Sequence, residues 1–318
     1  MNSVDLQPLV TIVVPSFNHA PYVRTCIEGI IRQTYRNIEL IVIDDGSTDD
    51  SVDRIAEIAD VCRVRFRRFE FRARANRGLS ATLDEALEWA RGRYFAAIAS
   101  DDVLLPEKTS VLVSKIEGRD DLAGVFGGGD VVDASGKILY RYPARPAIFS
   151  FSDILARRHC ILAPSQLLRA DMVRAVGGYA EGTYIEDWYM WLKLTESGAR
   201  LITIDDVLVL YRLHGGNMSG NALRMYESRK QIIGMFSRYP EARIAMSDIC
   251  VLAAIDFSRA SKIASIHHVA EALGNHGSVV FRSLFWSAIA RIATPVAALD
   301  ALKETRKALR RSFGAAIE

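Results

Sequence analysis

Cysteine is scarce in this sequence, and the cysteines that are present form no close pair. The chain of 318 residues has four of them, Cys26, Cys62, Cys160 and Cys250, all far apart. Without a CxxC pair or a regular spacing, neither a structural zinc site nor a disulfide framework is expected. The pattern suits the reducing cytosol, and we expect buried or unreactive thiols.

Long hydrophobic runs are missing as well. The longest stretch without a charged residue, Leu6–Val23, contains Pro8, Pro15 and Pro21. It cannot form a membrane-spanning helix, which needs about 20 predominantly apolar residues. The chain does not open with a basic segment followed by an apolar one, so we expect no secretory signal and a cytoplasmic protein. No GxGxxG motif follows the early apolar runs, which argues against a dinucleotide-binding fold.

A large net charge is absent too, but the charge is unevenly distributed. The chain has 40 basic and 38 acidic residues, a net charge of +2, and its composition is globular. Residues 1–220 hold 26 basic and 30 acidic side chains, whereas residues 221–318 hold 14 and 8. This asymmetry suggests that the C-terminal third meets an anionic partner. We do not expect nucleic acid, because the pI is only about 8.3 and no stacking aromatic motif lies among these cations.

What the first hundred residues do contain is an alternation of strands and helices. The runs predicted as strands are Leu9–Val14, Glu39–Ile43, Val64–Phe71 and Tyr94–Ala99. The helices predicted between them cover Tyr22–Gln33, a segment after Ser47 or Asp49 with Val52, Ile55, Ala56 and Ala59 on one face, and Leu79–Ala90. This order predicts a parallel sheet with ligands beyond the carboxyl ends of its strands. Those ends carry the polar tips Pro15–Asn18, Asp44–Ser47 and Ser100–Asp102.

After Pro106 the pattern changes. We predict a helix at Glu107–Ile116, a bend at Gly127–Gly129, a hairpin turn near Ala134–Gly136 and another turn at Gly177–Gly178. An aromatic-rich helix at Ile185–Thr195 and two short strands, Arg200–Ile204 and Val207–Leu213, follow. From Asn221 onward only helices are predicted. We therefore expect a first domain over residues 1–220, with halves at 1–105 and 106–220, and a helical region over 221–318.

Several polar groups at these positions suit chemistry, although each also has a structural interpretation. Adjacent carboxylates at Asp101 and Asp102 suit Mg²⁺ or Mn²⁺ with a diphosphate, or a solvated turn that caps the next helix. Asp44 suits a base N–H or a ribose hydroxyl, or a capped turn. His214 suits a metal or a diphosphate, or a structural role.

The segment around Glu186 and Asp187 leaves two interpretations open. Its carboxylates either stabilise the first turn of a helix or include a general base that neighbouring aromatic residues desolvate. Likewise, Trp188 and Trp191 form either an acceptor-sugar platform or part of the core.

Together the segments PSFN, IDDGSTD, ASDD, EDW and YRLH, in this order, resemble the inverting family-2 glycosyltransferases with the GT-A fold. The resemblance covers about Leu9 to Ser219, two-thirds of the chain. It implies an α/β fold, with a Rossmann-like, mostly parallel sheet flanked by helices and followed by a helical C-terminal extension. One acid common in the family is replaced by Ala99, and its Ala-Arg-Asn segment stands here as Ala81–Leu83.

The resemblance also assigns roles. Asp187 matches the catalytic base, and the positions matching metal ligands for Mn²⁺ or Mg²⁺ are Asp101, Asp102 and His214. The nucleotide-sugar-binding positions are Pro15, Ser16, Phe17, Asn18, Asp44, Ser100, Asp101, Glu186 and Arg212, with Arg77 in place of the missing arginine. Trp188 and Trp191 are assigned to the acceptor.

The implied activity is transfer of a sugar from a nucleoside diphosphate sugar, UDP preferred over dTDP or GDP, to a saccharide or lipid-linked saccharide. This transfer would serve cell-surface polysaccharide or lipopolysaccharide assembly. An inactive sugar-nucleotide-binding scaffold is the alternative.

The C-terminal region suggests a site of attachment. Apolar residues recur at helical spacing within Ser278–Thr294, and a basic amphipathic pattern follows Pro295. The residues of that pattern are Leu299, Leu302, Lys303, Arg306, Lys307, Leu309, Arg310, Arg311 and Phe313. Peripheral binding to the cytosolic face of the inner membrane and packing on the core or a second subunit both fit this pattern.

Overall fold

The computed structural model describes residues 7–142 and 144–298, and its internal contacts divide the chain into two units that meet between Asn217 and Met218. In the first unit, β1 (Val10–Ser16) is a continuous apolar run and is buried along almost its whole length. It pairs in parallel with β2 (Ile38–Asp44) and β4 (Tyr94–Ala97), and β2 pairs in parallel with β3 (Arg68–Ala73). The predicted parallel strands are thus confirmed.

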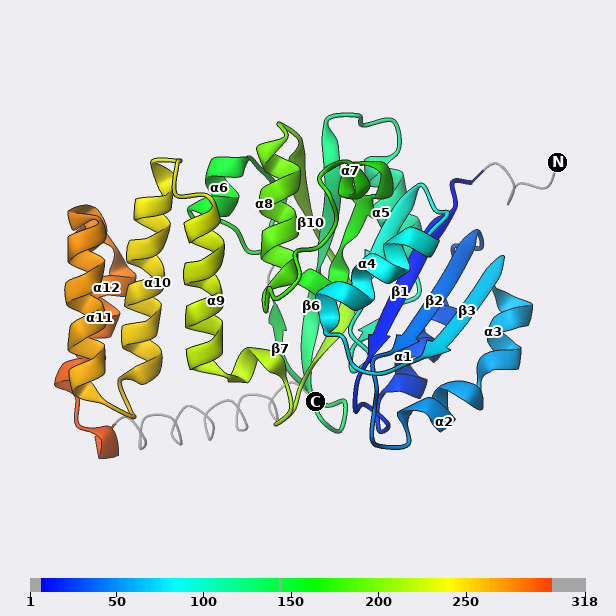
Figure 1. The fold of residues 1–318 in the computed structure, drawn as a ribbon, viewed down its shortest axis with the longest axis horizontal. Coiled ribbons are helices and arrows are strands. Elements are labelled where there is room, and N and C mark those ends of the chain that lie inside the picture. The colour runs from blue at the N-terminus through cyan, green and yellow to red at the C-terminus, as the bar shows by residue number, and fades with distance from the viewer. Residues whose placement is uncertain (1–6, 143, 299–318) are drawn as a thin grey trace, which may run out of the picture. The chain divides into compact units, whose positions relative to one another are not determined.

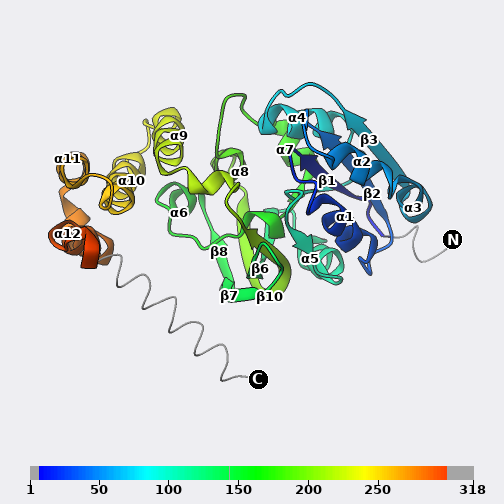
Figure 2. The ribbon, with the colours of Figure 1, turned by 90° about the horizontal axis from the view of Figure 1, so that it is seen from below.

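Helices cover both faces of this part of the sheet. Figure 2 shows α1 (Val23–Ile31) and α5 (Lys108–Ile116) on one side, with α4 (Leu79–Trp89) and α7 (Ala170–Ala175) on the other. The apolar side chains of α1 are buried because they recur at helical spacing. The sequence predictions for α1, α4 and α5 are confirmed.

The sheet continues as a mixed one, with strand order β3-β2-β1-β4-β9-β6-β10-β5 (Figure 1). β6 (Leu122–Asp133) and β10 (Arg200–Leu213) are parallel, whereas β9 (Leu167–Arg169) runs antiparallel to β4 and β6. The remaining pairs are antiparallel: β5 (Val103–Leu104) and β8 (Ala147–Phe149) with β10, and β7 (Ile138–Tyr142) with β6. The fold is α/β, as expected.

The predicted bend at Gly127–Gly129 is wrong, because these glycines lie inside β6. A Cβ atom on Gly127 would lie 2.5 Å from Cδ1 of Leu208, and one on Gly129 would lie 2.6 Å from Cδ2 of Leu162. Glycine is needed here for close packing of neighbouring chain segments, which a local reading of turn residues does not detect. The predicted hairpin turn beyond them is confirmed, since β6 and β7 pair across it.

Other predicted boundaries also need correction. The two strands predicted over 200–213 are one strand, β10. Register shifts in its pairing with β6 accommodate the polar residues in its middle. The single helix predicted after Ser47 is divided into α2 (Ser51–Ala56) and α3 (Ala59–Arg65), and α3 occupies the first residues of the predicted third strand. Elements of two to six residues, namely β5, β8, β9, α6 (Phe151–Leu155) and α7, are too short to give a periodic signal.

The second unit is helical, as predicted. Its helices are α9 (Ala222–Met235), α10 (Glu241–Phe257), α11 (Lys262–Asn275) and α12 (Ser283–Ala293). The continuous helix predicted over Ser278–Thr294 is wrong at its start, because 277–281 form a 3-10 turn before α12. The predicted basic pattern from Leu299 onward lies outside the described residues. Within the described ranges, none of the helices has the length and apolar character needed to cross a bilayer.

Candidate active site

The three predicted strand tips meet at one edge of the sheet. The backbone N–H of Asn18 donates to Oγ of Ser47 at 2.8 Å, and that of Asp45 donates to the carbonyl of Ser16 at 2.8 Å. Nδ1 of His19 and Oγ of Ser100 lie 2.8 Å apart and join the third tip to the first. Asn18 adopts a left-handed backbone conformation (φ 54°), which asparagine tolerates better than most residues.

At this edge, His19, Asp101 and His214 form a cluster that could hold a metal ion. One ligand atom from each lies within 4.8 Å of the other two. Nε2 of His214 is 2.9 Å from Oδ2 of Asp101, and Nδ1 of His19 is 3.9 Å from Oδ1. Buried Oδ1 of Asp101 has no hydrogen-bond partner within the described residues, as expected of a candidate cation ligand. One carboxylate and two imidazoles fit a divalent transition ion.

Sequence reasoning missed His19. Burial lowers the pKa of its imidazole more than the neighbouring Asp101 raises it, so the neutral ring keeps a lone pair for a metal. The available signal was its place directly after the first strand tip. Because the fold brings that tip beside Asp101, a polar residue there belongs to the site.

Arg212 holds the backbone next to this cluster in place through hydrogen bonds. Its Nε donates to the carbonyl of Asp101 at 2.9 Å, and its guanidinium also donates to the carbonyls of Asp133 and Ala134. The guanidinium carbon lies 4.9 Å from the ring centroid of Tyr22, which in turn packs on His214. These contacts involve Nε and Nη1 of Arg212, and its contact with the nucleotide sugar stays a prediction.

Asp102 is buried next to the cluster but does not join it. Its Oδ1 accepts a hydrogen bond from the backbone N–H of Arg212 at 2.8 Å, which ties the β4 tip to β10. Burial and the adjacent Asp101 raise the pKa of its carboxyl. This backbone contact involves Oδ1 alone, and Asp102 lies outside the cluster of His19, Asp101 and His214, so its role as a metal ligand stays a prediction.

The acidic pair at the end of β2, Asp44 and Asp45, also has hydrogen-bond partners within the protein. Asp44 accepts hydrogen bonds from the backbone and hydroxyl of Ser47, which is the capped-turn alternative. Asp45, which was given no role, accepts from the backbone N–H groups of Arg77 and Gly78 at 2.8 and 2.9 Å. The side chain of Arg77 is exposed, with Nη1 3.7 Å from Glu85. Among the predicted contacts on these loops, Phe17 is exposed at the first tip.

The second group of carboxylates lies at the start of α8 (Glu186–Glu196). Burial and repulsion from Asp187 raise the pKa of Glu186 to about 8. Burial also raises the pKa of Asp187, although the Trp188 N–H at 2.6 Å and the charge of Arg157 lower it in part. A carboxylate whose pKa is raised towards neutrality is suited to accept a proton from a hydroxyl.

Trp188 and Trp191 are core residues, which corrects their assignment to the acceptor. Each is only 3% exposed. The indole N–H of Trp188 donates to the carbonyl of Ile154, and Trp191 packs edge to face on Phe126. This is the interpretation that the sequence left open beside the acceptor platform.

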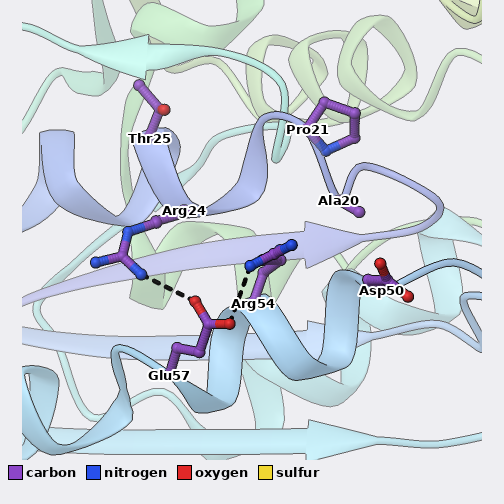
Figure 3. A pocket seen from close by; sticks show the side chains of 7 residues that line it. All are labelled: Ala20, Pro21, Arg24, Thr25, Asp50, Arg54 and Glu57. Atoms are coloured by element: carbon purple, nitrogen blue, oxygen red, sulfur yellow. Dashed lines mark hydrogen bonds and ion pairs between the residues drawn. The ribbon is translucent and has the colours of Figure 1, made fainter.

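A hollow of about 470 Å³ lies on the surface beside α1 and α2 (Figure 3). Its arginines, Arg24 and Arg54, both pair with the carboxylate of Glu57. The hollow is lined by Ala20, Pro21, Arg24, Thr25, Asp50, Arg54 and Glu57, a set that includes no predicted site residue. It is a polar surface feature beside the first two strand tips.

Comparison with known proteins shows which family this chain resembles. Residues 11–158 match a family model described as "Glycosyl transferase family 2". The glucosyltransferase WfgD of Escherichia coli, which transfers from UDP-Glc to α-D-GlcNAc-diphosphoundecaprenol, is 25% identical over 239 residues. These cover 74% of this chain and 89% of WfgD.

Two solved structures share the fold. The mannosyltransferase PcManGT of Pyrobaculum calidifontis, in complex with GDP-Man and Mn²⁺, has a TM-score of 0.59 and 18% identity. The match covers 96% of this chain and 83% of PcManGT. TarS 1–349 of S. aureus, in complex with UDP-GlcNAc, has a TM-score of 0.60 and 16% identity, with coverage of 85% and 90%. The sheet, the strand tips and the following helices thus belong to the GT-A fold.

Proposed function

We propose that this chain, which matches glycosyltransferase family 2 over residues 11–158, moves a sugar from a nucleoside diphosphate sugar to a saccharide or lipid-linked saccharide. The transfer would invert the anomeric centre and serve cell-surface polysaccharide assembly. UDP is the preferred nucleotide. The observation that carries this proposal is the cluster of His19, Asp101 and His214 at the strand tips, with a buried Asp101 oxygen left without a partner in the described chain.

The donor diphosphate is proposed to bind at this cluster. His19, Asp101 and His214 would hold Mn²⁺ or Mg²⁺, which when bound neutralises negative charge on a leaving diphosphate. Two imidazoles beside one carboxylate favour Mn²⁺, since Mg²⁺ prefers oxygen ligands. Arg212 and Asp102 keep the loop in place through the backbone.

Asp187 is proposed as the general base. Its carboxylate would accept the proton of the acceptor hydroxyl while that oxygen attacks the anomeric carbon from the face opposite the diphosphate. One displacement inverts the configuration, so an α-linked donor gives a β-linked product. Because burial raises the pKa of Asp187, the base would lose its proton only at higher pH than an exposed aspartate does.

The acceptor is proposed to be carried on a lipid. The name of WfgD specifies a diphosphoundecaprenol acceptor, and the second unit of this chain has large apolar side chains at its surface. Phe281 is 88% exposed and Trp286 is 59% exposed, and Arg291 lies on the same helix as Trp286. Such residues suit contact with an anionic membrane surface, and a second subunit is the other candidate for this region.

Liposome flotation tests the membrane proposal. The full chain should float with anionic vesicles, and a Phe281→Ser, Trp286→Ser variant should float less. Equal recovery of both proteins with the vesicles would count against these side chains as the contact. A sedimentation measurement of both proteins shows whether the pair instead supports self-association.

Nucleotide binding and turnover test the catalytic proposal. The full chain is titrated with UDP, GDP and dTDP, each with and without Mn²⁺, and then with the corresponding sugar nucleotides. Metal-dependent binding is expected, strongest for one nucleotide. Binding without transfer to any saccharide acceptor would favour the scaffold alternative, and absence of binding would remove the proposal.

A further inference from the structure

The loop that leads into α8 carries two buried hydroxyls that the proposed reaction does not yet use. Tyr179 is 4% exposed and Thr183 is 7% exposed. Neither Tyr179 Oη nor Thr183 Oγ1 has a hydrogen-bond partner in the part of the chain that the structure describes. Buried polar groups in folded proteins nearly always have a partner, so a ligand or an ordered water is expected to complete this pair.

The loop is fixed on α4 at two points. The backbone N–H of Tyr179 donates to Oδ1 of Asp84 at 2.7 Å, and Oγ of Ser80 donates to the carbonyl of Thr183 at 3.3 Å. Gly178 has φ 74°, and a Cβ atom there would lie 2.4 Å from the same Asp84 oxygen. The backbone of both residues is therefore held against α4.

The charges around Tyr179 restrict the kind of ligand. Burial, together with the carboxylates of Glu186, Asp187 and Asp84, raises the pKa of its phenol, which therefore stays protonated. Acidic side chains surround this place, which disfavours a phosphate group, and a protonated phenol is a poor metal ligand. Sugar hydroxyls fit, because they donate to carboxylates and accept from a phenol O–H.

We propose that the hydroxyls of Tyr179 and Thr183 bind hydroxyl groups of the donor sugar and so contribute to the choice of sugar. The inference rests on the proposed transfer from a sugar nucleotide. The donor is favoured over the acceptor because α4 begins directly after Arg77 and Gly78, which Asp45 holds at the strand tips. The loop that carries the two hydroxyls thus contacts a helix that starts at the strand tips.

Removal of the single phenol oxygen tests this assignment. Full-length wild type, Tyr179→Phe and Thr183→Val are titrated by calorimetry with UDP, UDP-GlcNAc, GDP and GDP-mannose in the presence of Mn²⁺. For the sugar nucleotide that wild type binds best, each variant should bind about 3- to 10-fold more weakly. Affinity for the parent nucleoside diphosphate should stay unchanged.

Thermal melting without ligand gives a second readout. Because the Tyr179 hydroxyl has no partner within the described chain, Tyr179→Phe should melt at the same temperature as wild type or higher. The matched control is Tyr94→Phe, whose hydroxyl donates to Glu117 Oε2 at 2.8 Å. That control should melt at a lower temperature and bind every nucleotide as wild type does.

Two results would overturn the inference. One is binding of the sugar nucleotide by both variants with wild-type affinity, and the other is an equal loss for the nucleoside diphosphate alone. A wild type that binds none of the four nucleotides would instead overturn the proposed function, and this inference with it. A lower melting temperature of Tyr179→Phe would show a structural partner and also count against it.

Discussion

The two groups of carboxylates in the first unit differ in how completely their surroundings satisfy them. At the strand tips, Asp44, Asp45 and Asp102 all accept hydrogen bonds from backbone N–H groups, and among the buried carboxylate oxygens there only Oδ1 of Asp101 lacks a partner within the described residues. At the start of α8, burial raises the pKa values of Glu186 and Asp187, and two hydroxyls nearby are unpartnered in that same part of the chain.

This difference suits the two groups to different roles: the strand tips to ligand binding, and the start of α8 to proton transfer. A region whose polar groups are paired with backbone is rigid and offers a ligand few free atoms, so its selectivity rests on a small cluster. A region with buried, incompletely satisfied groups is strained electrostatically and is suited to bind hydroxyls or move protons. We therefore expect substitutions in the two regions to change different measurements.

The largest effect is expected at Asp187. Asp187→Asn removes the proposed base while keeping the shape of the side chain, so turnover should fall about 10²- to 10⁴-fold. Affinity for the nucleoside diphosphate should change little, because the diphosphate is proposed to bind at the strand tips. Initial rates and calorimetric titration of the same preparation measure both, and turnover close to that of wild type would remove Asp187 from the reaction.

A smaller effect, and of another kind, should separate the neighbours Asp101 and Asp102. Asp101→Asn should weaken Mn²⁺-dependent nucleotide binding more than about 10-fold, because it removes the charged oxygen of the cluster. Asp102→Ala should instead lower the free energy of unfolding by about 1–3 kcal/mol, since the buried Arg212 N–H loses its acceptor. Urea unfolding and metal titration measure the two quantities, and the same profile in both variants would contradict the distinction.

The smallest effect is a pH dependence of stability. The folded protein holds the Glu186 proton up to a pKa of about 8, against an ordinary value of 4.5, so it binds more protons than the unfolded chain between these values. The free energy of unfolding should therefore fall as pH rises from about 4.5 to about 8. Glu186→Gln should flatten this part of the profile.

Glu181→Gln, an exposed carboxylate on the preceding loop, is the matched control and should leave the wild-type slope unchanged. Urea unfolding at a series of pH values measures the slopes. If Glu186→Gln kept the wild-type slope, the proton would have to be held elsewhere, and Asp187 with the nearby Tyr179 and Arg157 would be the next groups to test.

Sequence patterns predicted the first half of the sheet well because its signals are local. Apolar runs such as β1 and β2 end in polar tips, and parallel topology alone brings those tips together. The glycines of β6 and the continuity of β10 could not be predicted, since packing against residues up to 81 positions away decides them. A run of glycines without its packing partners looks like a turn.

The sequence predicted which segments form the candidate site, but not which of their atoms contact one another. Asp101 and His214 were chosen correctly as neighbours, because motif order preserves which segments converge. What Asp102 and Arg212 contact depends on backbone groups of β6 and β10, which no motif specifies. His19 and Tyr179 were missed because their surroundings depend on which distant segments pack together.

The contact between Asp101 and His214 has a consequence for assembly of the protein. These residues are 113 positions apart, and the second follows β10, the last strand of the first unit. Forming such a contact closes a long loop, which costs conformational entropy. Of the three proposed cation ligands, His214 comes last in the chain, so a chain that stops before the end of β10 would lack part of the proposed cation site.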